Sequence, residues 1–283
     1  MQTVNEYISL LQDKLNGITN QNEIRQFGFL LMNCLRGYSY TEFLTCKEEQ
    51  LTDKEIDFLN SAIVRLQKQE PIQHITGQTE FMGLIFKTDK RALIPRPETE
   101  ELVYLITNDF SDQISNILDV GTGTGCIPIS LKKQWPKANV ETWDVSDDAI
   151  SLAKENAELN HVEIIFSKID VLASPNIQRK YDLLVSNPPY VTISEKKVMD
   201  ENVLNYEPHL ALFVEDTEPL VFYDAIATLG TKALLPGGYI YFEINEMFGK
   251  EVCQLLDAKN YKKAMVITDL LGKDRFVKAV WPG

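Results

Sequence analysis

The chain has 283 residues, 44% of them hydrophobic and 24% charged, which is typical of a soluble globular protein with one large or two moderate domains. Its net charge of −13 and the absence of a Lys/Arg cluster argue against a large nucleic-acid interface, because such an interface needs a basic face. No apolar run approaches the ~18 residues of a membrane span, and neither an export signal nor a CxxC pair is present, so we expect a cytoplasmic protein with reduced thiols and no membrane partner.

Residues 1–72 predict a small helical bundle. An apolar stripe at helical spacing opens the chain, residues 22–35 are apolar enough for a buried helix, and Thr52 and Glu55 form a capping-box pattern before a third periodic segment. We expect three or four helices and no strand. The residues of the first stripe are Val4, Ile8, Leu11 and Leu15.

Residues 73–97 predict a β-hairpin that links this bundle to a second domain. Two short apolar stretches flank Thr88-Asp89-Lys90, where we expect the turn. Arg96 then stands between two prolines, and a helix is expected to begin near Glu98, at the start of a domain spanning 98–283.

From about residue 115 onward, strand and helix patterns alternate. This alternation predicts an α/β fold, a mostly parallel sheet covered on both faces, with an antiparallel pair of strands at the C-terminal end. The expected strands lie within 116–120, 139–145, 162–170, 181–187, 237–245, 263–270 and 275–281, and helices are expected within 125–135, 146–160 and 219–234.

The sequence ILDVGTGTG places a glycine-rich turn directly after a strand. Gly121, Gly123 and Gly125 alternate with Thr122 and Thr124, and glycine lets the backbone adopt positive φ and approach a ligand closely. A helix N-terminus beyond this turn would offer N–H groups to a polar ligand. The spacing differs from the dinucleotide pattern, and no P-loop lysine follows, which disfavours NAD and ATP.

Acidic residues stand at the ends of three successive predicted strands. Asp144 is placed to accept hydrogen bonds from ribose hydroxyls, although a turn or helix-capping acid is the alternative. Asp119 would receive an ammonium group or bind N–H groups of the loop. Asp170, with Val171 beside it, would face an adenine edge or serve as a turn acid. A nucleoside with an amino-acid tail, S-adenosylmethionine (SAM), fits this set better than a dinucleotide.

Taken with IPRPETE, these motifs and the tetrapeptide NPPY at 187–190 resemble the HemK/PrmC family of release factor glutamine N5-methyltransferases. The resemblance covers nearly the whole chain. It implies a Rossmann-like methyltransferase domain, SAM as methyl donor with S-adenosylhomocysteine as product, no metal, and class I peptide chain release factors as protein substrates. It also implies that the helical bundle recognises the substrate. NPPY alone marks a broader set that methylates planar nitrogens, so nucleobase methylation is the alternative.

The NPPY loop has its own physical interpretation. An amide nitrogen is a poor nucleophile, so it must be held in line with the methyl carbon by acceptors on its N–H groups. Asn187 offers a side-chain carbonyl and Pro188 a backbone carbonyl, while Pro188 and Pro189 carry no competing N–H and stiffen the loop. The ring of Tyr190 would cover the planar amide.

Three further positions follow from the resemblance. Arg96 would brace the substrate backbone or an adjacent acid, and Phe81 would line the pocket, with core packing as its alternative. Asn245 stands where the family often has glycine, which leaves the conformation of that loop open. No histidine lies in a strand-end motif, so we expect no dedicated general base. We expect a monomer, although the sequence does not reveal the oligomeric state.

Overall fold

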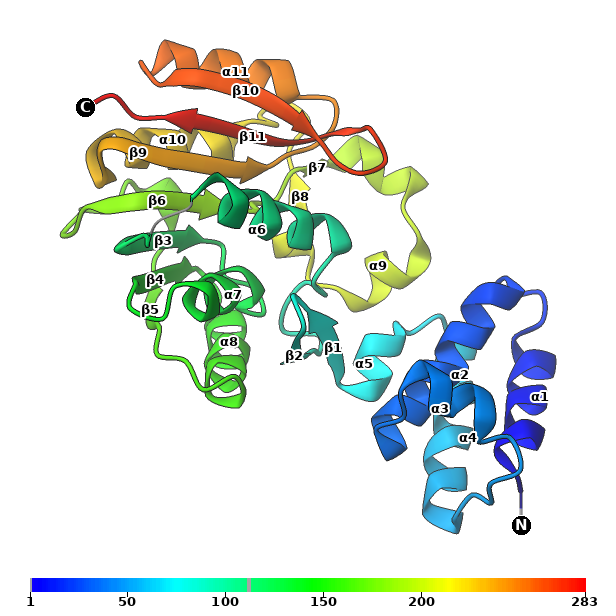
Figure 1. The fold of residues 1–283 in the computed structure, drawn as a ribbon. Helices are drawn as coiled ribbons and strands as arrows, with labels where there is room; N and C mark the ends of the chain where they lie inside the picture. The colour runs from blue at the N-terminus through cyan, green and yellow to red at the C-terminus, as the bar shows by residue number, and fades with distance from the viewer. Residues whose placement is uncertain (1, 111–112) are drawn as a thin grey trace. The chain divides into compact units, whose positions relative to one another are not determined.

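The computed structural model describes residues 2–110 and 113–283. These residues form two compact units (Figure 1). The smaller unit runs to Gln78 and also takes in Asp200–Tyr206, whereas the larger unit comprises Thr79–Met199 and Glu207–Gly283. No helix in these two ranges is long and apolar enough to cross a membrane.

The smaller unit is helical, as its periodicity predicts. Val4, Leu11 and Leu15 are buried along one face of the first helix, and Thr52 and Glu55 form the predicted capping box. A fifth helix, Ile72–Thr76, follows within the region predicted as linker. A short helix from much later in the chain, Glu201–Tyr206, also belongs to this unit, where Tyr206 Oη donates to Lys68 O over 3.0 Å. The helices are α1 (Val4–Leu15), α2 (Gln21–Arg36), α3 (Tyr40–Thr45), α4 (Asp53–Gln67), α5 (Ile72–Thr76) and α9 (Glu201–Tyr206).

The hairpin is present, but its predicted turn is wrong. β1 (Gln78–Phe81) and β2 (Leu84–Lys87) are joined by Met82 and Gly83, both at positive φ, 51° and 69°. Positive φ at both central positions defines a type I′ turn, whose twist matches that of the strands. The expected turn at 88–90 is instead a separate loop in which Asp89 Oδ1 accepts from the Arg91 N–H over 3.0 Å.

The larger unit is built on a seven-stranded sheet in the order β10-β11-β9-β6-β3-β4-β5. All neighbours are parallel except β11, which runs antiparallel to both β9 and β10, so the predicted mostly parallel sheet with an antiparallel C-terminal edge is confirmed. The strands are β3 (Asn116–Val120), β4 (Asn139–Asp144), β5 (Ile165–Lys168), β6 (Tyr181–Ser186), β9 (Leu234–Glu243), β10 (Lys262–Thr268) and β11 (Asp274–Val280).

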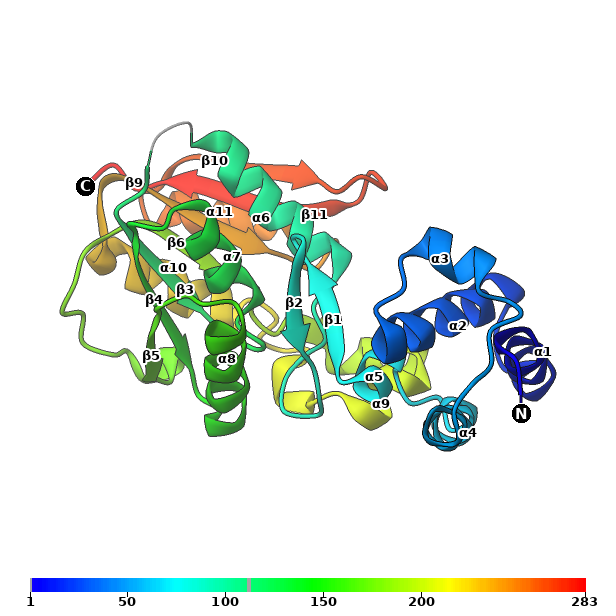
Figure 2. The ribbon, with the colours of Figure 1, turned by 60° about the horizontal axis from the view of Figure 1, so that its bottom comes forward.

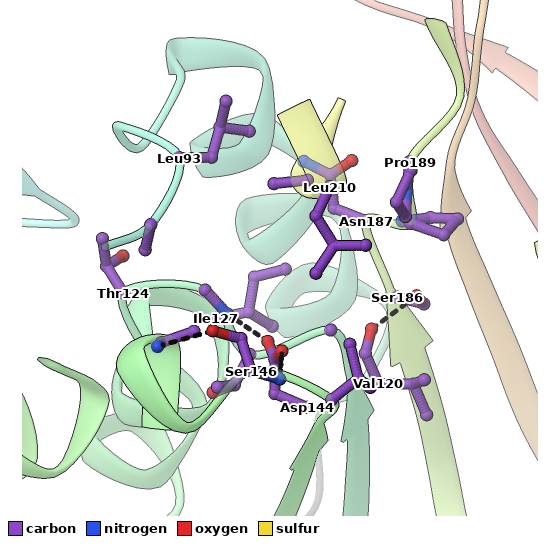
Figure 3. A pocket seen from close by; sticks show the side chains of 18 of the residues that line it. Leu93, Val120, Thr124, Ile127, Asp144, Ser146, Ser186, Asn187, Pro189 and Leu210 are labelled. Carbon is purple, nitrogen blue, oxygen red and sulfur yellow. Dashed lines mark hydrogen bonds between the residues drawn. The ribbon is translucent and has the colours of Figure 1, made fainter. Parts of the chain in front are cut away.

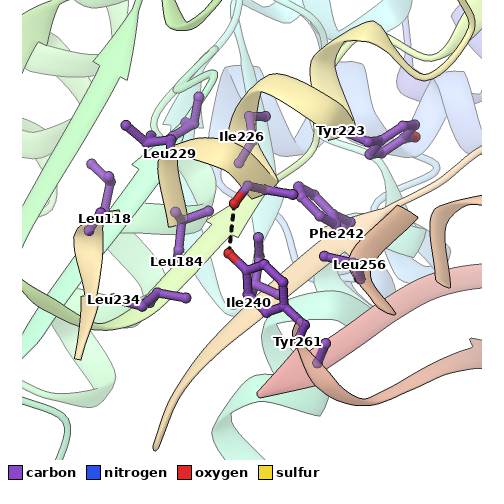
Figure 4. Packing of buried hydrophobic residues seen from close by; sticks show 14 of the residues in the cluster. Leu118, Leu184, Tyr223, Ile226, Leu229, Leu234, Ile240, Phe242, Leu256 and Tyr261 are labelled. Carbon is purple, nitrogen blue, oxygen red and sulfur yellow. Dashed lines mark hydrogen bonds between the residues drawn. The ribbon is translucent and has the colours of Figure 1, made fainter. Parts of the chain in front are cut away.

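Helices cover both faces of this sheet (Figures 1 and 2). Alternating strand residues feed two cores: Leu183 and Val185 of β6 pack on one side, and Leu184 packs on the other. Figure 4 shows the second core, where Leu184 and Leu118 meet the helices of that face. The first face carries α6 (Pro97–Asp109), α7 (Cys126–Gln134) and α8 (Asp147–Leu159), and the second carries α10 (Val221–Ala233) and the unpredicted α11 (Gly249–Ala258).

The third helix of the first face, α8, spans Asp147–Leu159 and begins at Ser146, whose side chain accepts from the Ala149 N–H. The chain returns from β5 at the sheet edge to β6 beside β3, so the sheet's switch point lies between β3 and β6. In open parallel sheets, ligands bind at the carboxyl ends of the strands at this point. Short elements complete the unit beyond it: β7 (Val191–Thr192), β8 (Phe213–Val214) and the 3₁₀ turns Val171–Ala173, Ile193–Val198 and His209–Ala211.

Candidate active site

The glycine loop connects β3 to α7 at the switch point. Gly121, Gly123 and Gly125 have φ of 85°, 53° and 83°, so all three need the conformation that glycine adopts without strain. The N–H groups of Gly121 and Gly123 are already bound, to Trp143 O at 2.8 Å and Asp144 Oδ2 at 3.1 Å. The glycines therefore act through backbone conformation, as the sequence suggested, and these two N–H groups hold the loop itself.

The threonines of this loop carry unused hydrogen-bonding groups. Thr122 Oγ1 and Thr124 Oγ1 are buried and have no hydrogen-bond partner within the described residues, and both residues line the pocket. Buried hydroxyls without partners are uncommon and point to a polar ligand or water in the pocket. The backbone of the loop is held from behind by Asn156 of α8, whose Nδ2 donates to Thr124 O over 2.9 Å.

Asp144 ends β4 and lines the same pocket (Figure 3). Its two oxygens accept from the N–H groups of Gly123 and Ser146, at 3.1 and 2.9 Å. Burial raises the pKa of this carboxyl, and the backbone N–H groups oppose the rise. A carboxylate has about four acceptor sites, so Asp144 keeps capacity for two hydroxyl donors while it fixes the loop.

Asp119 does not lie where the sequence placed it. The side chain is fully buried, does not line the pocket, and accepts from Thr142 Oγ1 over 2.5 Å. Burial raises its pKa to about 7. Direct contact with an ammonium group is therefore not supported, because β3 directs this side chain into the protein interior beneath the glycine loop.

The wall beyond β5 is formed by Asp170 and Val171, which both line the pocket. Asp170 Oδ1 accepts from the Leu172 N–H over 2.9 Å, so the turn-acid alternative is realised, and contact with an adenine edge stays a prediction. Much of the rest of the pocket lining is apolar, which suits the face of a planar ring. The apolar lining residues that the sequence did not single out include Ala92, Leu93, Ile127, Ala149, Leu210, Phe222 and Ile226.

NPPY lies at the carboxyl end of β6, on the opposite side of the switch point. Asn187, Pro188 and Pro189 line the pocket with the glycine loop and Asp144, as Figure 3 shows for Asn187, Pro189 and Asp144. Ser186 Oγ donates to Val120 O over 2.6 Å and ties the ends of β6 and β3 together. The structure therefore brings the two main sequence motifs into one pocket.

Tyr190 takes a different position from the one predicted. It does not line the pocket, and its hydroxyl donates to Glu243 Oε1 over 3.1 Å. Burial raises its pKa, as expected for a phenol that leaves water and becomes a donor to a carboxylate. We therefore revise its role from covering the substrate amide to anchoring the loop that carries Asn187.

Arg96 and Phe81 resolve the alternatives that the sequence left open. Arg96 lines the pocket and pairs with the buried carboxylate of Glu207 at 2.6 Å, so it braces an adjacent acid. Phe81 is 1% exposed, packs edge-to-face on Phe86 and does not line the pocket. Its prediction as a pocket residue is wrong, since β1 turns this ring into the hydrophobic core.

Asn245 needs no glycine conformation. Its φ is not positive. Its Nδ2 donates to Tyr190 O over 3.2 Å and to Glu195 Oε2 over 3.0 Å. Its Oδ1 accepts from the Met247 N–H over 3.0 Å. The asparagine thus supports the backbone after NPPY.

Family models match both units of the chain: the PrmC N-terminal domain over residues 9–77 and the methyltransferase small domain over residues 99–210. The release factor glutamine methyltransferase of Bacteroides thetaiotaomicron is 42% identical over 98% of this chain and 99% of its own length. That of Flavobacterium psychrophilum is 40% identical over 97% and 98%. The chain belongs to the release factor glutamine methyltransferase family.

Among solved structures, the similarity of this family member is one of fold only. A methyltransferase from Pyrococcus furiosus aligns with a TM-score of 0.51 at 16% identity, over 71% of this chain and 90% of its own. A Thermus thermophilus 16S rRNA methyltransferase solved with AdoMet and guanosine gives the same TM-score and identity over 72% and 49%. The α/β methyltransferase fold predicted from the sequence is confirmed.

Two residues of this methyltransferase, one bonded to Asn187 and one bonded to that residue in turn, were not predicted from the sequence. Thr99 lines the pocket and accepts from Asn187 Nδ2 over 3.2 Å, and Glu243 accepts from Thr99 Oγ1 over 2.7 Å. Thr99 lies within IPRPETE, and Glu243 precedes Ile244 at the end of β9. Both residues lie in segments that the sequence marks as motifs, but only the tertiary fold brings Thr99 and Glu243 together.

Proposed function

We propose that this chain transfers a methyl group from SAM to the side-chain amide nitrogen (N5) of the glutamine in the GGQ motif of class I peptide chain release factors. The observation that carries the proposal is the convergence of Asn187 and Pro188 with the glycine loop and Asp144 in one pocket. The name shared by the relatives over almost the full chain supports the same substrate.

The pocket has the chemistry that SAM requires. Asp144 retains acceptor capacity for the ribose hydroxyls, and the unpaired hydroxyls of Thr122 and Thr124 offer donors and acceptors to the amino-acid tail. Asp170 and Val171, among apolar side chains, suit the adenine ring. When bound, SAM supplies an electrophilic methyl group on a sulfonium. The chain's own residues bind the donor and position the acceptor.

NPPY would hold the acceptor amide. Asn187 Oδ1 and the Pro188 carbonyl are acceptors for the two N–H groups of a primary amide, and two N–H acceptors favour the positive charge that develops on nitrogen during transfer. The prolines limit the loop's freedom, so little entropy is lost on binding. Once methylated, the nitrogen is acidic and releases its proton without a dedicated base, so rate enhancement comes from position and electrostatics.

Two substitutions separate the roles of acceptor and donor sites. Asn187→Ala should lower kcat about 100-fold, because it removes one amide acceptor, while the Kd for SAM stays within about 3-fold. Asp144→Ala should raise the Kd for SAM at least about 10-fold, because it removes the ribose acceptor and frees the loop. Calorimetry and methyl-transfer rates measure both. Loss of SAM binding in Asn187→Ala would mean that its role is misassigned.

The competing acceptor is a nucleobase. Radiolabelled SAM should label a purified release factor and leave tRNA, rRNA and DNA unlabelled, in keeping with the net charge of −13. Label on nucleic acid without label on the protein would overturn the proposal. We place the reaction in the cytoplasm, where release factors act, with a monomeric enzyme.

A further inference from the structure

A chain of hydrogen bonds runs behind Asn187 and ends on a buried carboxylate. Asn187 Nδ2 donates to Thr99 Oγ1 over 3.2 Å, and Thr99 Oγ1 donates to Glu243 Oε2 over 2.7 Å. The other oxygen of Glu243 accepts from Tyr190 Oη over 3.1 Å. Three segments far apart in the sequence therefore meet at Glu243: the start of α6, the NPPY loop and the end of β9.

The direction of this chain follows from Glu243. The side chain is 1% exposed, and an ionised carboxylate only accepts hydrogen bonds. The Thr99 hydroxyl has a single proton, which it must donate to Glu243, so its oxygen is left to accept. Asn187 must then turn its NH₂ group toward Thr99.

This removes an ambiguity that is general for asparagine. The two ends of a carboxamide have nearly the same shape, and the hydrogen-bond network alone decides which end faces which way. With its NH₂ group on Thr99, Asn187 holds Oδ1 away from Thr99, and Asn187 itself lines the pocket. Rotated by half a turn, it would offer donors instead, which repel the N–H groups of a substrate amide.

The surroundings of Glu243 act on its charge in opposite directions. Burial raises the pKa of this carboxyl, while the hydroxyls of Thr99 and Tyr190 and the positive charge of Arg275 oppose that rise. A neutral carboxyl could donate to Thr99, and the orientation of the whole chain would no longer be fixed. The hydroxyls of Thr99 and Tyr190 thus favour the ionised form of Glu243, and the ionised form in turn fixes the direction of their hydrogen bonds.

We propose that Thr99 is a positioning residue for Asn187, with Glu243 fixing the direction of their hydrogen bond, so that Asn187 Oδ1 faces the acceptor amide. This inference rests on the proposed function of Asn187 and extends it to the segment IPRPETE, whose resemblance to the family carried no physical explanation. It assigns Thr99 no contact with the reacting atoms.

The test compares Thr99→Val, which has the same shape without a hydroxyl, with Thr99→Ser, which keeps the hydroxyl. Thr99→Val should lower kcat about 10- to 100-fold, with the Kd for SAM and the KM for the release factor changed less than about 3-fold. Thr99→Ser should recover kcat to within about 3-fold of the wild type. Thr231→Val removes a hydroxyl that bonds within α10, and serves as the control with unchanged kcat.

A second readout does not depend on activity. The side-chain amide protons of Asn187, assigned by their loss in Asn187→Asp, should shift in nitrogen–proton correlation spectra of Thr99→Val and of Glu243→Gln, and should stay in place in Thr231→Val. Glu243→Gln should also lower kcat, because its amide can donate to Thr99 and reverse the chain.

The outcomes separate the two proposals. Unshifted Asn187 signals in Thr99→Val, or shifted signals with wild-type kcat, would overturn the positioning role while leaving the proposed function intact. Failure of Thr99→Ser to recover kcat would also overturn it, since a packing role would explain the loss. A wild-type protein that methylates no release factor would overturn the proposed function, while the amide spectra would still report whether Thr99 orients Asn187.

Discussion

At the scale of single residues, the pocket is built from acids with different tasks. Asp144 faces the pocket and also holds the glycine loop through Gly123. Asp119, one strand away, lies in the interior, where Oδ2 accepts from Thr142. Glu243 accepts from two hydroxyls behind Asn187. Burial raises the pKa of all three carboxyls, but only Asp144 is open to a ligand.

Asp119 should make the stability of the ligand-free protein depend on pH. Its folded pKa is about 7, against about 3.8 when unfolded, so the folded state binds the extra proton between these values. Its contribution to stability is therefore lost as pH rises from about 4 to about 7. Asp119→Asn should flatten the fall in unfolding free energy between pH 5 and pH 8, measured by urea denaturation.

The matched control is Asp148→Asn, which replaces an exposed aspartate at the start of α8. It should keep the wild-type dependence on pH across the same range. An Asp119→Asn variant that retains the full wild-type slope would show that another group causes it.

At the scale of elements, the glycine loop depends on backbone conformation more than on free N–H groups. Gly125 begins α7 at φ 83°, and a Cβ there would stand 3.0 Å from Ile129 Cδ1 and 3.1 Å from Ala153 Cβ. The loop is therefore packed against α7 and α8. Its shape is a property of three elements together.

Gly125→Ala should destabilise the protein by about 2–3 kcal/mol, from positive φ and from crowding together. Gly272→Ala is the matched control: φ is 81°, but no atom of the residues that the structure describes lies within 4 Å of the added Cβ, so only the conformational cost of about 1 kcal/mol remains. Urea denaturation measures the difference. Equal losses in the two variants would contradict the tight packing of the loop.

Elements with a local signal could be predicted from the sequence, and those set by distant contacts could not. β3 and β6 read as short apolar runs because both of their faces are buried. The turn at Met82 lacks the Asn-Gly signal of a type I′ turn, so the sequence predicts the turn six residues further along the chain, at Thr88. Thr99 and Glu243 are 144 positions apart, and no periodicity connects them.

At the scale of the whole molecule, the chain combines a methyltransferase unit with a helical unit that has a separate hydrophobic core. The predicted boundary at residue 72 falls inside α5, and the structure moves it to Gln78. Asp200–Tyr206 also groups with the helical unit, which sequence reasoning could not foresee because this segment lies beyond NPPY in the chain. Substrate recognition by the helical unit remains a proposal from the family resemblance.

Deleting residues 1–78 tests that role. The shortened protein should bind SAM with a Kd within about 3-fold of the full chain, because all pocket residues lie in the larger unit. Its KM for the release factor should rise at least about 10-fold, from the loss of a recognition surface. An unchanged KM, with SAM binding intact, would show that the helical unit does not recognise the substrate.

The central claim is that the pocket methylates the side-chain amide of one glutamine. The most direct measurement is tandem mass spectrometry of an unmethylated class I release factor after reaction with SAM, with wild-type protein and with Asn187→Ala. We predict a single methyl group on the GGQ glutamine with the wild type and almost none with the variant. A methyl group on any other residue, or equal methylation by both proteins, would contradict the claim.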